Sequence, residues 1–422
     1  MKYQLDQKVP FLTNLLYGLQ WWIVSLPCVI IIGAVISKIH YDDIALQTMY
    51  MQKIFAVMGI TTIVQVLWGH RLPLVIGPAS VLLIGVLASL PAGIAAIYTA
   101  VMIGGLMMAI LAFSGLLTKL RFVFTARIIT VILILIPFTL MPTIIKLIFD
   151  NQHHTFFNLI FALIFVISLL LLNRWLRGVW KSTTVILGLI LASFVYYVIN
   201  GFPIIETVGY SNQAFQNGLF INLKFDIGTI IAFLFCFIAL LVNELGSIEA
   251  IGQLLQADNV GQRIKSGVGI SGLSNILSGS LGIVGSVDYS MSTGVISATG
   301  CASRYSLIPA GLGLIVCAFL PQMVNILNHI PPLVMGTLLI YLMSTQLSSG
   351  FTMLIREKAV NTFEDGIIVG LPLMVAILIS FIPTVSIEQM PDIVKPIIGN
   401  GFVVGVIIVL LLEHIIFKKR TD

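Results

Sequence analysis

The feature that most constrains the fold is a succession of apolar runs, each about 20 residues long, along the whole chain. We predict spans at 12–37, 50–68, 72–90, 92–118, 124–148, 155–173, 180–200, 227–248, 265–284, 289–302, 305–327, 331–350, 365–386 and 396–417. A run of this length crosses a bilayer as a helix, whereas barrel strands are about half as long. The sequence therefore predicts an all-α integral membrane protein with about 14 transmembrane segments.

Composition agrees with this class. Hydrophobic residues make up 58% of the chain, charged residues make up 9%, and mean hydropathy is +1.07. A soluble domain needs a far more polar surface, and the net charge of +5 lies in short loops, which argues against nucleic-acid binding. We expect no disulfide framework, metal site or cofactor, because the cysteines are scattered through apolar segments without paired spacing. They are Cys28, Cys236, Cys301 and Cys317.

The basic residues predict the orientation of the chain in the membrane. With the N-terminus in the cytoplasm, most of the 22 lysines and arginines fall in cytoplasmic loops. The exceptions are Lys38, Lys53, Lys146, Lys224 and Lys395. One missed span would invert the sides beyond it, so this bias also supports the number of spans. We therefore expect a multi-pass protein of the cell membrane with both termini in the cytoplasm.

Two of the predicted segments are interrupted, the third and the tenth. The interrupting residues are Pro73, Gly77, Pro78, Gly294, Gly300 and several serines of the tenth segment. Interrupted spans at matching positions of two halves indicate a transporter built from an inverted repeat. We accordingly predict two seven-span repeats, residues 1–200 and 201–422, whose breaks meet near the bilayer midplane. A simple proline kink in the third segment is the alternative.

Three acids lie within the apolar part of the chain. The stretch from Gly282 to Arg304 reads GIVGSVDYSMSTGVISATGCASR, contains Asp288, and is too polar for a lipid-facing helix. Glu244 and Glu249 lie in the eighth predicted span. A carboxylate buried in hydrocarbon tends to bind a proton, which is the property that a proton-coupled carrier needs. A carboxylate satisfied by a helix N-terminus, or one that faces the cytoplasm, is the alternative for each acid.

Other chemistry-bearing residues give weaker indications. Tyr289 follows Asp288 and could stack on a planar ligand or donate a hydrogen bond, or it could be an interfacial aromatic residue. All histidines fall in loops or at span ends, so we expect no histidine proton relay inside the membrane. They are His40, His70, His153, His154, His329 and His414. No metalloprotease, P-loop or nucleophile-elbow pattern is present in the sequence, so nothing favours an enzyme.

Several short motifs resemble one transporter family. Tyr17–Gln20 (YGLQ), His70–Pro73 (HRLP) with Gly77–Ser80 (GPAS), and Ile330–Gly336 (IPPLVMG) are similar to its first, third and twelfth segments. Met291–Gly300 (MSTGVISATG) matches the Gly, the Thr and the last position of its signature (Q/E/P)-N-x-G-x-x-x-x-T-(R/K/G). Over most of its length the chain therefore resembles the nucleobase–ascorbate transporter family, which includes uracil and xanthine permeases.

The signature departs from the family pattern at its first two positions. Met291 and Ser292 stand where the family has an acid or amide and then Asn, and Trp21 stands where a histidine is usual. In the family, the first signature residue binds the base directly, which a methionine cannot do through paired hydrogen bonds. Either the substrate differs, or Asp288 takes over this role.

The acid of the eighth segment can be matched to the family in two registers. The register with fewer gaps places Asn243 and Glu244 at the acid position and Ser247 at the next binding position. The other register places Glu249 there, in the sequence EAIG. We favour the first register.

The resemblance also implies an architecture and a function. Each interrupted segment would be a short strand followed by a half-helix, and the two would cross at the site between a core domain and a gate domain. We expect a secondary active transporter that imports a nucleobase with protons or sodium, often as a dimer in the lipid bilayer. A purine such as xanthine or uric acid is favoured over uracil, because the pyrimidine-type Glu is missing from the signature.

The resemblance assigns a role to individual residues as well. The backbones of Ala79, Ser80 and Ser290 would bind base edges, Tyr289 would shape the pocket, and Glu244 would bind the base. Glu244, Asp288 and Glu249 are the candidates for proton coupling. An anion carrier of the sulfate or bicarbonate type on the same fold is one alternative, and a membrane enzyme or receptor without transport is another.

Overall fold

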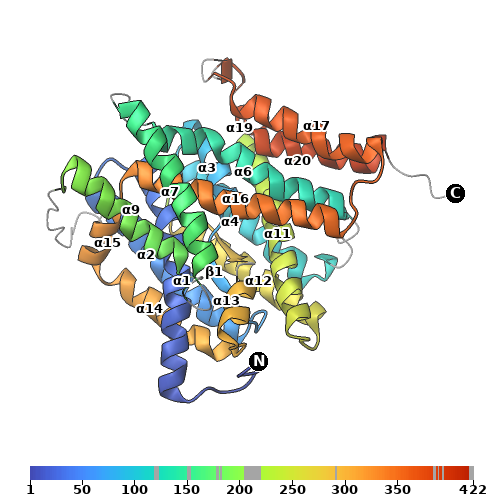
Figure 1. The fold of residues 1–422 in the computed structure, drawn as a ribbon. Helices are drawn as coiled ribbons and strands as arrows, with labels where there is room; N and C mark the ends of the chain where they lie inside the picture. Colours follow the sequence, from blue (N-terminus) through green and yellow to red (C-terminus); the bar gives the residue numbers. More distant parts are fainter. Residues whose placement is uncertain are drawn as a thin grey trace.

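The computed structural model describes residues 1–117, 123–149, 154–176, 180, 183–203, 220–289, 292–383, 386–387, 389–391 and 394–417. Within these ranges the protein is mainly helical (Figure 1). Eight of the described helices are long and apolar enough to cross a membrane, or nine if one bent pair counts as a single span. The chain is therefore a multi-pass membrane protein.

The helices follow the predicted spans with boundaries that differ by several residues. They are α1 (Phe11–His40), α2 (Ile44–Leu67), α3 (Ser80–Ala88), α4 (Ile94–Phe113), α6 (Ala126–Ile148), α7 (Thr155–Trp175), α9 (Thr184–Asn200), α11 (Ile227–Leu254), α12 (Val260–Ser280), α13 (Ser292–Thr299), α14 (Leu307–Ala318), α15 (Pro321–Asn328), α16 (Pro332–Arg356), α17 (Phe363–Ser380), α19 (Lys395–Ile398) and α20 (Gly401–Leu411). A π-helical turn, η5 (Leu412–Ile416), continues α20, and two 3₁₀ turns are η1 (Leu90–Ala92) and η4 (Arg304–Ser306).

The eleventh predicted span is not one straight helix. Residues 305–327 form α14 and α15, whose axes differ by 84°. Pro321 is at the start of α15, where its fixed φ and missing N–H suit a new helix and do not allow α14 to continue. The sequence predicted the apolar run correctly but not the bend.

Two short strands replace helix at the interrupted third and tenth segments. β1 (Val75–Pro78) precedes α3, and β2 (Ser286–Tyr289) precedes α13. The strands pair antiparallel, with Ile76 opposite Asp288 and Gly77 opposite Val287. Two segments more than 200 residues apart in sequence thus meet inside the helical body (Figure 1).

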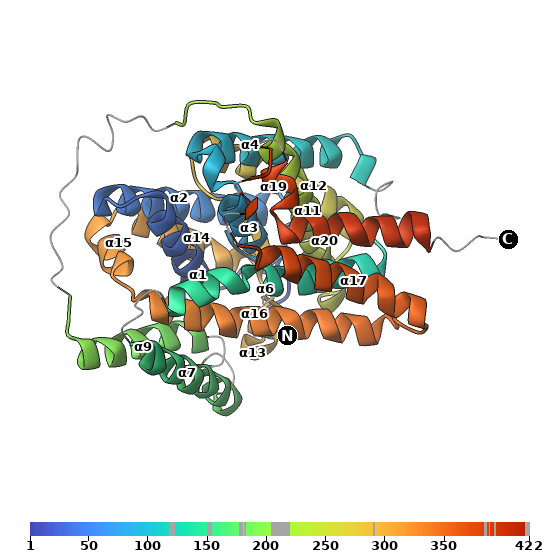
Figure 2. The same ribbon diagram turned by 90° about the horizontal axis from the view of Figure 1, so that it is seen from above.

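The helices form two packed groups, which we call the strand-bearing body and the outer layer. In the strand-bearing body, α1, α2, α3, α4, α11, α12 and α14 pack against one another and around β1 and β2. In the outer layer, α6, α7, α9, α16, α17 and α20 pack mainly against one another (Figure 2). Each group contains helices from both halves of the chain, so the halves 1–200 and 201–422 are interleaved in space.

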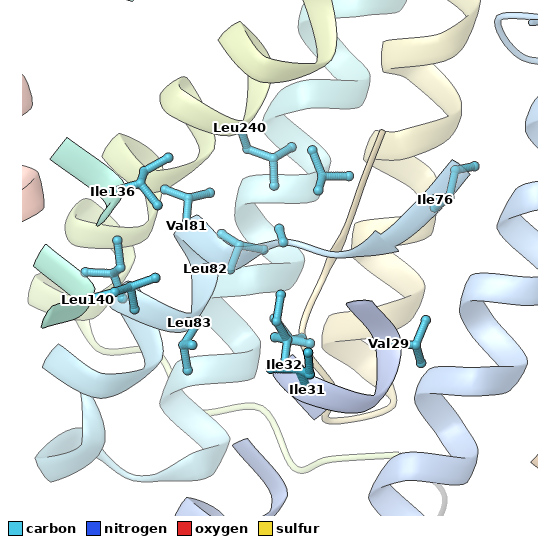
Figure 3. Packing of buried hydrophobic residues seen from close by; sticks show 14 of the residues in the cluster. Val29, Ile31, Ile32, Ile76, Val81, Leu82, Leu83, Ile136, Leu140 and Leu240 are labelled. Carbon is cyan, nitrogen blue, oxygen red and sulfur yellow. The ribbon is translucent and has the colours of Figure 1, made fainter. Parts of the chain in front are cut away.

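The half-helix α3 is held by apolar contacts on several sides. Its residues Val81, Leu82 and Leu83 are buried between α1, α6 and α11 (Figure 3). Ile136 and Leu140 of α6 lie on one side of it. This packing fixes the direction in which the N-terminus of α3 points, and that N-terminus begins directly after β1.

Candidate functional site

The strand crossing requires glycine at one position. A Cβ on Gly77 would lie 2.3 Å from a ring carbon of Tyr289, so that ring packs directly on the backbone of β1. The Tyr289 hydroxyl donates to the Pro78 carbonyl at 2.5 Å. Tyr289 therefore packs within the strand crossing. Its hydroxyl is already used within the protein, and the ring is what it can offer to a ligand.

α11 holds the backbone of Asp288 at two points. The Asp288 N–H donates to Oε1 of Glu244 at 3.3 Å, and the Ser247 hydroxyl donates to the Asp288 carbonyl at 3.1 Å. Glu244 and Ser247 can do this together because residues three apart lie on the same side of a helix. α11 therefore contacts the tenth segment through Glu244 and Ser247.

Two carboxyl groups meet here without exposure to solvent. Glu244 and Asp288 are both 0% exposed. Three of their carboxyl oxygens have no hydrogen-bond partner among the described residues. They are Oδ1 and Oδ2 of Asp288 and Oε2 of Glu244. Two buried carboxylates on residues that contact each other cannot both be ionised cheaply, so the pair favours holding a proton.

His70 also reaches this site, although the sequence places it at a span end. It is 0% exposed, and its Nε2 lies 3.6 Å from Oδ1 of Asp288. In the structure, α2 ends at Leu67, and the residues that follow it pack against α12. A Cβ on Gly267 of α12 would lie 3.0 Å from the His70 side chain. The one feature of the sequence that could have indicated a role for His70 is its position just before the interrupted third segment.

Polar side chains of α12 extend the site. Ser274 bonds to Thr61 of α2 at 2.6 Å and to Ser286 of β2 at 2.9 Å. Asn275 donates to the carbonyls of Ser271 and Ser286. Ser271, Ser274 and Asn275 of α12 thus face other protein groups, as polar residues within a membrane must. This network was not predicted from the sequence.

Of the other residues predicted to bind the base, Ala79 already has its backbone groups in hydrogen bonds within the protein. The Ala79 N–H donates to the Gly285 carbonyl at 2.8 Å, and the Ala79 carbonyl accepts from Leu82 at the start of α3. The backbone of Ala79 is therefore not open to a ligand in this conformation. Ser80 and Asn243 are half-buried. Ser290 and Met291 lie outside the described residues.

Glu249 differs from Glu244 in position. It is half-buried and lies five residues further along α11, about 140° around the helix axis. Gly246 is exposed, and a Cβ added to it would have no atom within 4 Å, whereas a Cβ on Gly252 would meet Val260 at 3.0 Å. Close packing therefore explains the glycine at position 252 and not the one at position 246.

Comparisons with known proteins identify the family of the chain. A family model described as Permease family, of the xanthine and uracil permease type, matches residues 12–385. The chain is 25% identical to the nucleobase transporter PlUacP of Paenibacillus larvae, over 86% of each protein. It is 23% identical to the xanthine permease of Bacillus subtilis, over 86% of this chain and 84% of the relative.

The fold has a counterpart among solved structures. The transmembrane domain of the cyanobacterial bicarbonate transporter BicA superposes with a TM-score of 0.62. The match covers 89% of this chain and 98% of that domain, at 15% sequence identity. At this identity the likeness describes the fold alone.

Proposed function

The chain belongs to the Permease family of xanthine and uracil permeases, and on that premise we propose that it imports a nucleobase by secondary active transport. A purine such as xanthine or uric acid is the favoured substrate, and uracil is the alternative. The names of the relatives support a nucleobase, and the missing pyrimidine-type Glu at Met291 supports a purine.

The observation that carries the proposal is the buried pair of Glu244 and Asp288 beside the crossing strands. In our proposal, this pair takes the coupling proton, and Glu244 also faces the base. Sodium in place of the proton is the less favoured variant. Ser247, Asn243, Met291 and the Tyr289 ring would shape the site, together with the backbones of Ser80 and Ser290. Glu249 would act only if the second register of α11 were correct.

We also propose an architecture for transport. The fourteen segments would form two inverted repeats, 1–200 and 201–422, whose broken segments three and ten meet at the site. The strand-bearing body would be the core domain, the outer layer would be the gate domain, and relative movement of the two would expose the site alternately. Antiparallel pairing of β1 and β2, each followed by a short helix, supports this arrangement. Both termini would be cytoplasmic, in the cell membrane, with dimers as the assembly.

The first experiment is uptake of labelled xanthine, uric acid and uracil into vesicles that contain the purified protein. Parallel samples carry an inward proton gradient, an inward sodium gradient or neither. Accumulation of one base that depends on the proton gradient is the expected result. Uptake of sulfate or bicarbonate, with no uptake of any base by folded protein, would overturn the proposal in favour of an anion carrier.

A further inference from the structure

His70 is held by bonds to three of its neighbours. Its backbone N–H donates to Oε1 of Gln65 at 3.2 Å, and its carbonyl accepts from the Arg263 guanidinium at 3.1 Å. Its ring Nδ1 accepts from the Leu72 N–H at 2.9 Å. Only Nε2 has no hydrogen-bond partner among the described residues, and it lies 3.6 Å from Oδ1 of Asp288. The imidazole is therefore a fixed group with one free position.

The bond from Leu72 determines where the ring carries its hydrogen. Because Nδ1 accepts a hydrogen bond, it cannot itself be protonated, so the neutral ring must carry its hydrogen on Nε2. In a protonated ring, the Nδ1–H would point at the Leu72 N–H, and the two donors would repel each other. The bond from Leu72 therefore disfavours the protonated ring. His70 is thus a neutral donor whose N–H is directed towards Asp288. The gap to Oδ1 exceeds a hydrogen bond by only a few tenths of an ångström.

The charged and titratable groups around this contact come from every element packed against it. Glu244 on α11 is the other buried acid. Arg263 on α12 bonds to the carbonyls of His70 and Arg71, and Arg304 of η4 bonds to the Val66 carbonyl at the end of α2. On β2, Tyr289 follows Asp288 directly, and its hydroxyl donates to the Pro78 carbonyl. No cation contacts the Asp288 carboxyl among the described residues, which leaves the His70 Nε2–H and a protonated Glu244 as the groups that can donate to it.

We propose that His70 is a positioning residue for proton coupling, which stabilises the ionised form of Asp288 through its Nε2–H. This inference rests on the proposed function. When Asp288 loses its proton, the gap closes and the N–H donates to the carboxylate. When Asp288 is protonated, the contact is weaker. His70 thereby sets the pH at which Asp288 takes up and releases the proton, without carrying that proton itself.

The test compares the variants His70→Gln, His70→Asn and His70→Leu in the vesicle assay over a series of external pH values. The amide nitrogen of Gln lies near the position of Nε2, whereas that of Asn lies near Nδ1 and cannot reach Asp288. Without the donor, Asp288 stays protonated to higher pH. We expect the pH of half-maximal uptake to rise by about 1–2 units in His70→Asn and His70→Leu, since a hydrogen bond to a charged group is worth that much. His70→Gln should retain the wild-type profile.

The controls distinguish failure of the His70 positioning role from failure of proton coupling itself. His154→Leu, at an exposed position, should leave the profile unchanged. Reduced uptake at every pH with an unchanged midpoint in all three His70 variants would overturn the positioning role and leave proton coupling intact. Uptake by the wild-type protein that ignores both pH and the proton gradient would instead overturn the coupling on which both proposals depend. Substitution of Asn is the variant to rely on if Leu prevents folding, because Asn keeps a polar side chain.

Discussion

Oε1 of Glu244 accepts the backbone N–H of Asp288 at 3.3 Å, so that a side chain of α11 holds the strand β2 at the residue that carries the second buried acid. Protonation of Glu244 weakens its oxygens as acceptors, and therefore changes how firmly β2 is held. A single proton can in this way alter both the charge of the site and the attachment of β2.

Glu244→Gln should abolish accumulation against a gradient while it preserves insertion and exchange of substrate across the membrane. The amide oxygen of Gln can still accept the Asp288 N–H, but the side chain can no longer bind or release a proton. We expect at least a tenfold loss of proton-driven accumulation, measured beside substrate counterflow in the same vesicles. Normal accumulation by Glu244→Gln, with loss in Glu249→Gln, would assign coupling to the second register of α11.

Gly77→Ala should impair substrate binding in folded protein. Its Cβ would lie 2.3 Å from the Tyr289 ring, which is also fixed by the bond to Pro78, so the ring and the strand crossing must shift. We expect a raised KM for uptake, with little change in expression or in elution from a sizing column. The matched control is Gly370→Ala on α17, where nothing lies within 4 Å of the added carbon. Equal KM values for the two variants would show that the Tyr289 ring does not shape the site.

The sequence predicted a mainly helical, multi-pass membrane protein because span length and hydropathy are local properties. The family resemblance found in the short motifs is confirmed by the family match over residues 12–385. The 84° bend between α14 and α15 was not predicted, because the run 305–327 is apolar on both sides of Pro321. Helix direction after a break depends on tertiary packing, which a single sequence does not reveal.

The site was predicted only in part. Glu244 and Asp288 were identified because an acid within an apolar run must have a reason to be there. His70 was missed because its position in a loop gives no sign of burial, which arises only when the turn after α2 packs beneath α12. The bond from Ala79 to Gly285 was also not predicted, since it depends on the pairing of two distant segments.

Gly272→Ala should destabilise the packing of α12 on α4. The added carbon would lie 2.5 Å from the backbone nitrogen of Ala109, so the two helices would have to move apart. Overpacking of this kind costs about 1–3 kcal/mol, which should lower the thermal unfolding midpoint in detergent. Gly366→Ala on α17, where nothing lies within 4 Å, is the control and should be neutral or slightly stabilising. An unchanged midpoint for Gly272→Ala would mean that this helix contact is loose.

Arg127 of α6 joins three elements of the outer layer. Its Nε and Nη2 bond to the two oxygens of Glu413 in η5 at 2.8 and 2.9 Å, and its Nη1 bonds to Asp365 of α17. Both carboxylates are nearly buried, at 4% and 7% exposure. Arg127→Ala removes the cation that both carboxylates bind, so we expect a loss of about 2–4 kcal/mol in stability. Thermal unfolding in detergent measures this loss.

Other substitutions test whether the paired bonds from the Arg127 guanidinium to Glu413 contribute to stability beyond the positive charge. Arg127→Lys keeps the charge but cannot reproduce the paired bonds to Glu413, so it should recover only part of the stability. Arg356→Ala is the control, because Arg356 is 74% exposed and pairs with Glu357 at the surface, where such a pair contributes about 0–1 kcal/mol. Neutralising both acids with Asp365→Asn and Glu413→Gln should reduce the damage caused by Arg127→Ala, because it removes the uncompensated charges. If the Arg127 and Arg356 variants unfold at the same temperature, the three-element contact does not stabilise the outer layer.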